Sequence, residues 1–200
     1  NGIEFLYANI HTHHGMYPLY KNQLPFFWEG RDGKKLLVFS GEHYHLGNSL
    51  GLAGDDMAVL RDRITAYLQN LEEDGYEYDF VPISVSGVQS DNAPPNKRIV
   101  RNIMEFNESF GKNIRIEMVT LQELYEKIMQ QLKELPAYRG DLTDWWANGI
   151  ASTPYAVKHY KEAQWMYRLC RRLDPEGRIV DRSLLKEAEE NLLLYAEHTW

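Results

Sequence analysis

Strand-like and helix-like stretches alternate along the first 135 residues of the chain. Short apolar runs, which are typical of buried strands, are separated by longer stretches whose apolar residues recur with the helical period. The predicted strands cover residues 3–10, 35–40, 79–86 and 113–119, and the predicted helices cover residues 56–73, 95–110 and 120–135. This alternation is typical of a parallel sheet covered by helices. The sequence therefore predicts an α/β fold with about four parallel strands.

Two local signals mark element boundaries. Thr120 and Glu123 have the spacing of a capping box, in which each side chain hydrogen-bonds the backbone N–H of the other residue, so a helix should begin there. Its expected apolar face consists of Leu121, Leu124, Ile128, Leu132 and Leu135. Asp32-Gly33, just before the second predicted strand, is typical of a hairpin turn. Residues 11–34 otherwise lack a helical period and are predicted to form a long loop.

The alternation of strand-like and helix-like stretches stops at residue 135. Two helices are expected beyond this point, one over residues 153–173 and one from Ser183 towards the C-terminus. Asp174-Pro175-Glu176-Gly177 separates them, because proline and glycine interrupt a helix. The chain is therefore expected to divide into an α/β part, residues 1–135, and a part made of loop and helices, residues 136–200.

Charge and composition limit the partners of the chain. A formal net charge of −7 disfavours nucleic acid and anionic membrane surfaces, and no apolar run approaches the roughly 20 residues that span a bilayer. The single cysteine, Cys170, excludes an internal disulfide framework and is compatible with a reducing compartment such as the cytoplasm. The 13 Tyr and 5 Trp suit the flat C–H faces of sugars, although large rings equally fill an irregular core.

Polar clusters follow each of the predicted strands. In parallel sheets and barrels the carboxyl ends of the strands meet at one rim, where functional residues collect. The first strand is followed by His11, His13 and His14, the second by Glu42, His43, Tyr44 and His45, the third by Gln89, Ser90, Asp91 and Asn92, and the fourth, after its helix, by the loop Asp141–Trp146. We therefore expect these side chains to share one rim of the fold.

The histidines at this rim fit three roles. His11-Thr12-His13 resembles the opening ligand pair of zinc-dependent amidohydrolases, but apart from Asp91 the further ligands of such a site have no obvious place. The same side chains also suit hydrogen bonding to a substrate, or a purely structural role. Asp91 likewise fits a catalytic acid, a metal ligand or the cap of the helix that follows. The sequence contains no serine-nucleophile elbow and no phosphate or dinucleotide loop.

Several segments resemble glycoside hydrolase family 38, the zinc-dependent α-mannosidases. Pro25-Phe26-Phe27-Trp28-Glu29-Gly30-Arg31-Asp32-Gly33 is similar to the family's aromatic-Trp-Glu-Gly stretch, and Asp91-Asn92-Ala93-Pro94-Pro95 is similar to the loop that supplies its acidic residue. Arg139-Gly140-Asp141-Leu142 resembles the block before the family's helical bundle. Near the C-terminus, His198 falls where the family has a zinc-binding His, although Thr199 replaces the Asp that typically follows.

The resemblance implies a seven-stranded parallel β/α barrel followed by a three-helix bundle, of which this chain would hold the later part. Residues 1–135 would belong to the catalytic barrel, and residues 136–200 to an active-site loop and the start of the bundle. The family's first zinc pair, His-x-Asp, and its nucleophilic Asp have no counterpart here, and the chain begins at Asn1 rather than Met. We therefore expect a segment of a larger enzyme, which works with the remainder of the same polypeptide and is inactive in isolation.

The implied reaction is retaining hydrolysis of α-mannosidic bonds in oligosaccharides or glycans. The resemblance makes Asp91 the expected acid/base and zinc, partly held by His198, the expected cofactor. The sugar pocket is expected to be lined by His11, His13, His14, Trp28, His43, His45, Asp141 and Trp145. Two alternatives stay open, a metal-dependent amidohydrolase or sugar deacetylase centred on His11 and His13, and a non-catalytic carbohydrate-binding remnant. The expected partner is a carbohydrate, and a homo-oligomer is compatible with the sequence.

Overall fold

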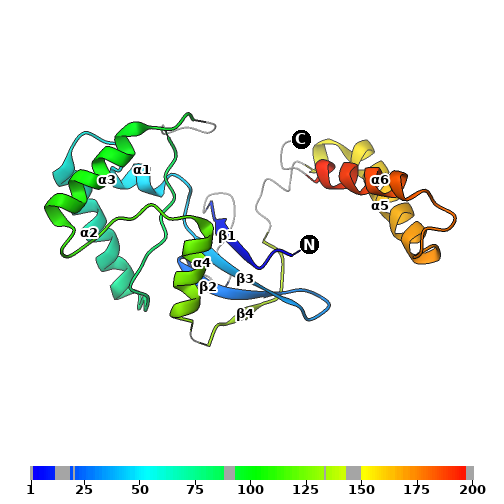
Figure 1. The fold of residues 1–200 in the computed structure, drawn as a ribbon, viewed down its shortest axis with the longest axis horizontal. Coiled ribbons are helices and arrows are strands. Elements are labelled where there is room, and N and C mark those ends of the chain that lie inside the picture. Colours follow the sequence, from blue (N-terminus) through cyan, green and yellow to red (C-terminus); the bar gives the residue numbers. More distant parts are fainter. Residues whose placement is uncertain are drawn as a thin grey trace. The chain divides into compact units, whose positions relative to one another are not determined.

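The computed structural model of the chain describes residues 2–11, 19, 21–87, 93–132, 134–142 and 150–196. The chain divides into two units, residues 1–142, which hold a sheet and its covering helices, and residues 143–200, which hold two further helices (Figure 1). None of the described helices combines the length and the hydrophobicity that crossing a membrane requires.

The described residues of the first unit form a mixed sheet of four strands in the spatial order β1-β3-β2-β4. The strands are β1 (Phe5–Asn9), β2 (Leu24–Glu29), β3 (Lys35–Gly41) and β4 (Ala137–Tyr138). β1 runs parallel to β3, β2 runs antiparallel to β3, and the short β4 pairs in parallel with β2. The expectation of an all-parallel sheet is therefore wrong, whereas the strands predicted at residues 3–10 and 35–40 are confirmed.

A tight turn between β2 and β3 is the reason for their antiparallel pairing. The Gly30 N–H donates to the Lys34 carbonyl at 2.9 Å, and the Gly33 N–H donates to the Gly30 carbonyl at 3.1 Å. So short a connection joins only antiparallel strands, because a parallel pair needs a crossover of about a dozen residues or more. The hairpin turn predicted from Asp32-Gly33 is confirmed, but β2 lies inside residues 11–34, which were predicted to be loop.

Asparagine side chains, rather than neighbouring strands, hold two segments that were predicted to be strands. The Asn48 side chain donates to the Ser86 carbonyl at 3.0 Å and accepts from the Ser86 N–H at 2.9 Å. The Asn107 side chain makes the same pair of bonds to Ile116, at 2.7 and 2.8 Å. A carboxamide carries the donor and acceptor of a peptide group, so each asparagine satisfies one residue's backbone as a partner strand would. The strand predictions at residues 79–86 and 113–119 are wrong.

The described helices of the first unit are α1 (Leu46–Leu50), α2 (Met57–Glu73), α3 (Lys97–Phe110) and α4 (Leu121–Gln130). α2 begins after Asp56, whose carboxylate accepts from two backbone N–H groups of the first turn. The capping box of α4 is confirmed, since the Thr120 side chain accepts from the Glu123 N–H and Glu123 Oε2 accepts from the Thr120 N–H at 2.6 Å. α1 lies between the strand predicted at residues 35–40 and the helix predicted at residues 56–73, where no helix is predicted, and α4 ends at Gln130 rather than near residue 135.

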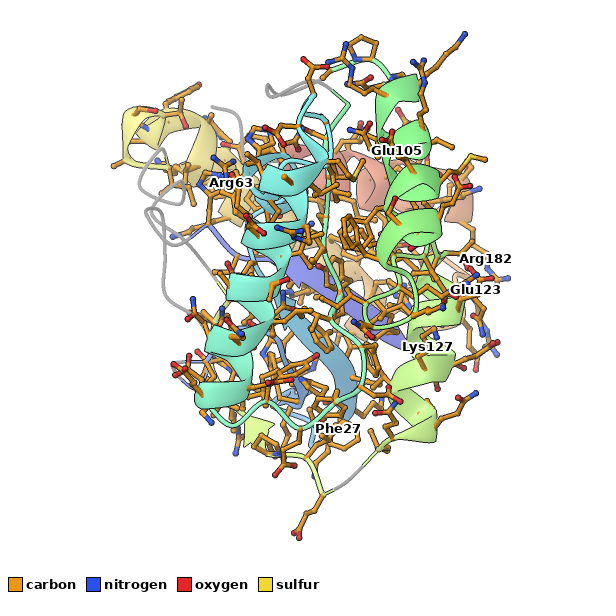
Figure 2. The ribbon with its side chains drawn as sticks, turned by 90° about the vertical axis from the view of Figure 1, so that its left-hand side faces the viewer. Phe27, Arg63, Glu105, Glu123, Lys127 and Arg182 are labelled. Carbon is orange, nitrogen blue, oxygen red and sulfur yellow. The ribbon has the colours of Figure 1, made fainter. Side chains whose placement is uncertain are left out.

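Two apolar clusters form the core of the first unit. One lies among α1, α2 and α3 and consists of Leu50, Leu52, Leu60, Ile64 and Phe106. The other joins β3 to α4 and consists of Leu37, Phe39, Leu124 and Ile128. In Figure 2, side chains fill the space between α2, α3 and α4, the last of which is marked by Glu123 and Lys127. α4 therefore covers the face of the sheet towards which Leu37 and Phe39, two residues apart on β3, both point.

The second unit is a hairpin of two helices, α5 (Pro154–Leu173) and α6 (Arg182–Tyr195). Tyr160, in the first half of α5, stacks on Tyr195 at the end of α6 with ring centroids 4.4 Å apart, so the two helices run antiparallel. Asp174 follows α5, and its carboxylate accepts from the backbone N–H groups of residues 178–180 in the connection. Both predicted helices are confirmed, but no residue of either helix is buried.

Candidate functional site

The parallel strands β1 and β3 end side by side, and rings gather just beyond them. Asn9 of β1 is paired with Gly41 of β3, and the Ile10 N–H donates to the Gly41 carbonyl at 3.0 Å. The centroids of the His11 and His43 rings lie 3.7 Å apart. We refer to His11, His43, Tyr44 and His45 as the ring cluster. The structure thus brings together histidines that follow the first and the second predicted strand.

Stacking and one backbone hydrogen bond fix the rings of this cluster. Tyr44 stacks on His43 with centroids 4.4 Å apart and 25° between the ring planes, and it meets the His45 ring edge-on at 4.3 Å. His43 Nδ1 accepts a hydrogen bond from the His45 N–H at 2.9 Å, so this nitrogen carries no proton. His45 Nε2 is buried and makes no hydrogen bond to a described residue. The cluster therefore offers ring faces together with imidazole nitrogens, which suits a flat ligand with polar edges.

A polar network lies at the same end of β3. Glu42, the residue after β3, accepts hydrogen bonds at Oε1 from the Tyr67 hydroxyl, 2.7 Å away, and from the Asn22 side chain. The Gln23 side chain donates to the Tyr67 hydroxyl at 2.9 Å and to the Pro82 carbonyl at 3.0 Å. We refer to Glu42, Tyr67, Asn22 and Gln23 as the Glu42 network. Residues before β2, on α2 and at the end of β3 thus converge on one carboxylate.

Tyr7 lies on β1 beside this network. Burial raises the pKa of the Tyr7 hydroxyl, the nearby Ser84 hydroxyl lowers it, and the Glu42 carboxylate raises it again, with a net upward shift; the hydroxyl makes no hydrogen bond of ordinary geometry to a described residue. Gly41 makes room for the ring, because a Cβ at this position would lie 2.6 Å from the Tyr7 hydroxyl oxygen. The Ser84 hydroxyl also donates to the Asn9 side chain at 2.9 Å. Tyr7 therefore stays protonated at neutral pH, and Ser84 ties the 79–86 segment to the end of β1.

Sequence reasoning does not find Gln23 or Tyr67 as site residues. Gln23 lies in the stretch predicted to be loop, and Tyr67 occupies one more position of an amphipathic helix. Only Glu42 carries a usable signal, because it is a polar residue directly after a buried strand. The network depends on the packing of α2 near the end of β3, which no local pattern reveals.

Trp28 and Asp141 lie at the other end of the sheet. Trp28 of β2 is paired with Leu36 near the start of β3, about 20 Å along that strand from the ring cluster. Its indole N–H donates to the Gly140 carbonyl at 2.8 Å. The Asp141 carbonyl accepts from the Tyr138 hydroxyl at 2.8 Å. The structure therefore joins Trp28 to the segment that holds Asp141 but brings neither residue to the ring cluster, and the sugar-binding roles of both stay predictions.

Five predicted site residues lie outside the part of the chain that the structure describes, namely His13, His14, Asp91, Trp145 and His198. Among the described residues, no three His, Cys, Asp or Glu side chains are placed to hold one metal ion. The zinc ligand expected at His198 and the acid/base expected at Asp91 therefore stay predictions.

One comparison with known proteins gave a match. The family model described as glycosyl hydrolases family 38 N-terminal domain matches residues 3–141. Neither the curated proteins nor the solved structures compared with the chain gave a match. The matched range contains all four described strands, the ring cluster and the Glu42 network, and it ends before α5.

Proposed function

The chain belongs to glycosyl hydrolase family 38, and on this premise we propose that it forms part of a retaining α-mannosidase. The family assignment points to a glycoside hydrolase, and α-mannosidic bonds of oligosaccharides or glycans are the substrate that we propose. The observation that carries the proposal is the position of the ring cluster and the Glu42 network. Both lie within the matched residues 3–141, at the carboxyl ends of two parallel strands, where β/α folds place their active sites.

The ring cluster supports the binding of a sugar. The partly exposed rings of His43 and Tyr44 offer apolar carbon atoms to the C–H face of a hexose. Hydroxyl groups at the edge of the sugar need hydrogen-bonding partners among the polar side chains near these rings. Apolar faces with a few polar atoms at their edges are the composition that small-molecule sites share.

Asp91 is the proposed acid/base. In a retaining glycosidase one carboxylic acid protonates the leaving oxygen and later, as a base, activates water, while a second carboxylate about 5 Å away attacks the sugar. Asp91 lies between Gly87 and Pro94, which approach each other so closely that a Cβ on Gly87 would overlap the Pro94 carbonyl. Ser84 is tied to the end of β1. The described residues on either side of Asp91 therefore lie next to each other, and Ser84 connects this part of the chain to the end of β1.

The seven-stranded barrel and the zinc ion belong to the same proposal. The parallel neighbours β1 and β3 suit such a barrel, and the second unit, with α5 and α6, would begin the helical bundle. Zinc rests on the family resemblance and on His198. Because the described residues supply no set of three ligands, they do not by themselves fit a zinc ion, and no step of the reaction is assigned to the metal.

Hydrolysis by the full-length protein tests the proposal. We expect release of 4-nitrophenol from 4-nitrophenyl α-D-mannopyranoside, with the α-anomer as the first product in proton NMR, and loss of activity after treatment with a chelator. Hydrolysis of other glycosides in the absence of α-mannosidase activity would contradict the proposed substrate, and a β-anomer as the first product would contradict retention.

The Asp91→Ala variant tests the acid/base assignment. We expect turnover of α-mannosides with poor leaving groups to fall by about 100- to 10,000-fold, because such groups depart only when protonated. The activated 4-nitrophenyl substrate should be affected much less in its first step. Asp62→Ala, at an exposed carboxylate on α2, is the matched control. Near-normal turnover of the poor substrates by Asp91→Ala would remove Asp91 from this role.

The adjacency of His11 and His43 keeps one alternative function open, a metal-dependent amidohydrolase or sugar deacetylase. Metal analysis of the full-length protein with His11→Ala and His13→Ala separates the two proposals. Loss of bound zinc in the variant would favour the amidohydrolase, and retention of zinc would favour the mannosidase. A protein that binds α-mannosides without hydrolysing any glycoside would instead be a carbohydrate-binding remnant.

A further inference from the structure

We propose that Glu42 is a substrate-binding carboxylate, with one oxygen held by the protein and the other accepting a hydrogen bond from a hydroxyl of the sugar. The inference rests on the proposed function and adds to it a residue that fixes the orientation of the sugar. Glu42 directly follows β3 and precedes His43 of the ring cluster, and it is half-buried. It thus lies at the edge of the sheet where the proposed sugar site is located.

The hydrogen bonds of Glu42 are all on one oxygen. Oε1 accepts from the Tyr67 hydroxyl at 2.7 Å and from the Asn22 side chain. Oε2 accepts no hydrogen bond from a described residue, and no described Lys or Arg forms an ion pair with Glu42. A carboxylate has about four acceptor sites over its two oxygens, so the part of the chain that the structure describes uses only half of the capacity of Glu42.

The other members of the Glu42 network orient this carboxylate. Gln23 is 1% exposed and uses its amide group as donor to the Tyr67 hydroxyl and to the Pro82 carbonyl. Tyr67 therefore accepts from Gln23 and donates its own proton to Glu42, which sets the direction of the chain of hydrogen bonds. Gln23, Tyr67 and Asn22 are positioning residues, because they act on the substrate through Glu42.

The backbone of Gln23 supports a functional reason for this arrangement. Its φ is +49°, a left-handed conformation that is uncommon and unfavourable for residues other than glycine. Such strain persists only where the surroundings enforce it, and it gathers at functional sites. Here the strained residue is fully enclosed and its side chain supports the donor that holds Glu42.

The chemistry of a sugar fits what Glu42 and the ring cluster offer together. The ring faces of His43 and Tyr44 suit C–H groups, whereas a carboxylate oxygen is the strongest acceptor available for a hydroxyl, because a charge-assisted hydrogen bond is about twice as strong as a neutral one. Glu42 and the rings of His43 and Tyr44, which follow it directly in the chain, thus offer both kinds of contact.

Glu42→Gln in the full-length protein, assayed on α-mannosides that each lack one hydroxyl, tests the inference. On the parent substrate we expect kcat/KM to fall by about 10- to 100-fold, the effect of losing a hydrogen bond to a charged group. With the wild type, kcat/KM for one deoxy substrate should be lower than for the parent substrate by a similar factor. For that substrate, replacing Glu42 by Gln should not lower kcat/KM any further. That absence of additivity identifies the contacted hydroxyl.

Tyr67→Phe and two controls keep the test decisive. Tyr67→Phe removes one donor to Oε1 and should reduce kcat/KM by a smaller factor than Glu42→Gln, with the same dependence on the missing hydroxyl. This variant keeps the inference testable if Glu42→Gln folds poorly. Glu73→Gln, at an exposed position of α2, and Tyr125→Phe, whose ring packs against Phe5, make the same chemical changes elsewhere and should leave kcat/KM unchanged.

The outcomes separate this inference from the proposed function. An equal loss on every deoxy substrate, or no loss with Glu42→Gln, would overturn the role of Glu42 and leave the α-mannosidase proposal standing. A wild type that hydrolyses no α-mannoside would overturn the proposed function, and the sugar contact of Glu42 with it.

Discussion

The two units of the chain bury their apolar side chains to very different degrees. In the first unit Phe106 and Ile128 are 0% exposed, at the centres of the two apolar clusters. In the second unit no residue of α5 or α6 is buried, and large side chains such as Trp165 and Leu193 are 61% and 67% exposed. Both units contain regular helices, but among the described residues buried apolar side chains lie only in the first unit.

This difference shows what helical signals do and do not provide. A Pro in the first turn marks the start of α5, and the Asp181 cap marks the start of α6. Stability comes mainly from apolar area removed from water, at about 25 cal/mol per Å², and the hairpin removes little. The first unit is thus stabilised by its core, and the second by contacts between its two helices, such as the Tyr160–Tyr195 stack.

The largest expected effect is the loss of a core side chain. Phe106→Ala should lower the free energy of unfolding of the first unit by about 3–5 kcal/mol, because it removes buried apolar area and leaves a cavity. Trp165→Ala, at an exposed position of α5, should cost less than about 1 kcal/mol. Urea unfolding of both variants checks the comparison. An equally large effect of Trp165→Ala would mean that α5 buries this side chain in solution.

Asn107→Ala tests the polar ties of the first unit. The substitution leaves the N–H and carbonyl of Ile116 without their partner and should cost about 1–3 kcal/mol in unfolding free energy. Asn70→Ala, at an exposed position of α2, is the control, because it raises helix propensity by the same amount but breaks no such hydrogen bonds. Equal stability of the two variants would show that residues 113–119 have another backbone partner in solution.

Two threonines at helix starts give a matched pair across the units. Thr120 caps α4 through a full capping box, whereas Thr153 precedes α5 without a side-chain cap. Thr120→Ala should therefore cost about 1 kcal/mol, and Thr153→Ala only a few tenths. Thermal unfolding followed by circular dichroism measures both. A cost at Thr153 as large as that at Thr120 would show that α5 gains a cap in solution.

The smallest effect is a local one, in the connection between α5 and α6. The backbone N–H groups of Val180, Arg178 and Ile179 lower the pKa of the Asp174 carboxyl. Because the folded-state pKa is lowered, the stabilisation is fully present above the ordinary value of about 4 and is lost as the pH falls through the lowered value. Amide hydrogen exchange at these three residues should accelerate, relative to intrinsic rates, below about pH 4.

Asp174→Asn provides the control for this pH dependence. The variant should show fast exchange at residues 178–180 at every pH, because its weaker acceptor carries no charge. Glu187→Gln, at an exposed position of α6, should leave the exchange unchanged. Protection that persists in Asp174→Asn at neutral pH would show that the turn holds without the carboxylate.

The parts of the fold that sequence reasoning predicts correctly are those set by neighbours along the chain. The start of α4 follows from Thr120 and Glu123, three residues apart, and the β2–β3 turn follows from Asp32-Gly33. Strand β2 is missed because Pro25 interrupts its pattern. The structure accommodates Pro25, since β4 pairs only with residues further along β2 and requires no N–H there.

The candidate site is predictable to a similar extent. The meeting of His11 with His43 follows from the rule that parallel strands end at one edge, which needs only the two strands. The Glu42 network does not follow, because Asn22, Gln23 and Tyr67 reach the carboxylate through the folding back of β2 and the packing of α2. Trp28, expected at the same pocket, lies at the opposite end because its strand runs antiparallel.

The sequence by itself determined where the helices α2 to α6 begin, the hairpin turn and the family to which the chain belongs, because these depend on residue types at short, fixed spacings. Only the tertiary structure decided which apolar runs pair as strands. Residues 79–86 resemble a strand as closely as residues 35–40, but the side chain of Asn48 satisfies the backbone of Ser86. Polar groups of the backbone and the side chains form hydrogen bonds with residues that are distant in the sequence, and bonds of this kind also orient Glu42.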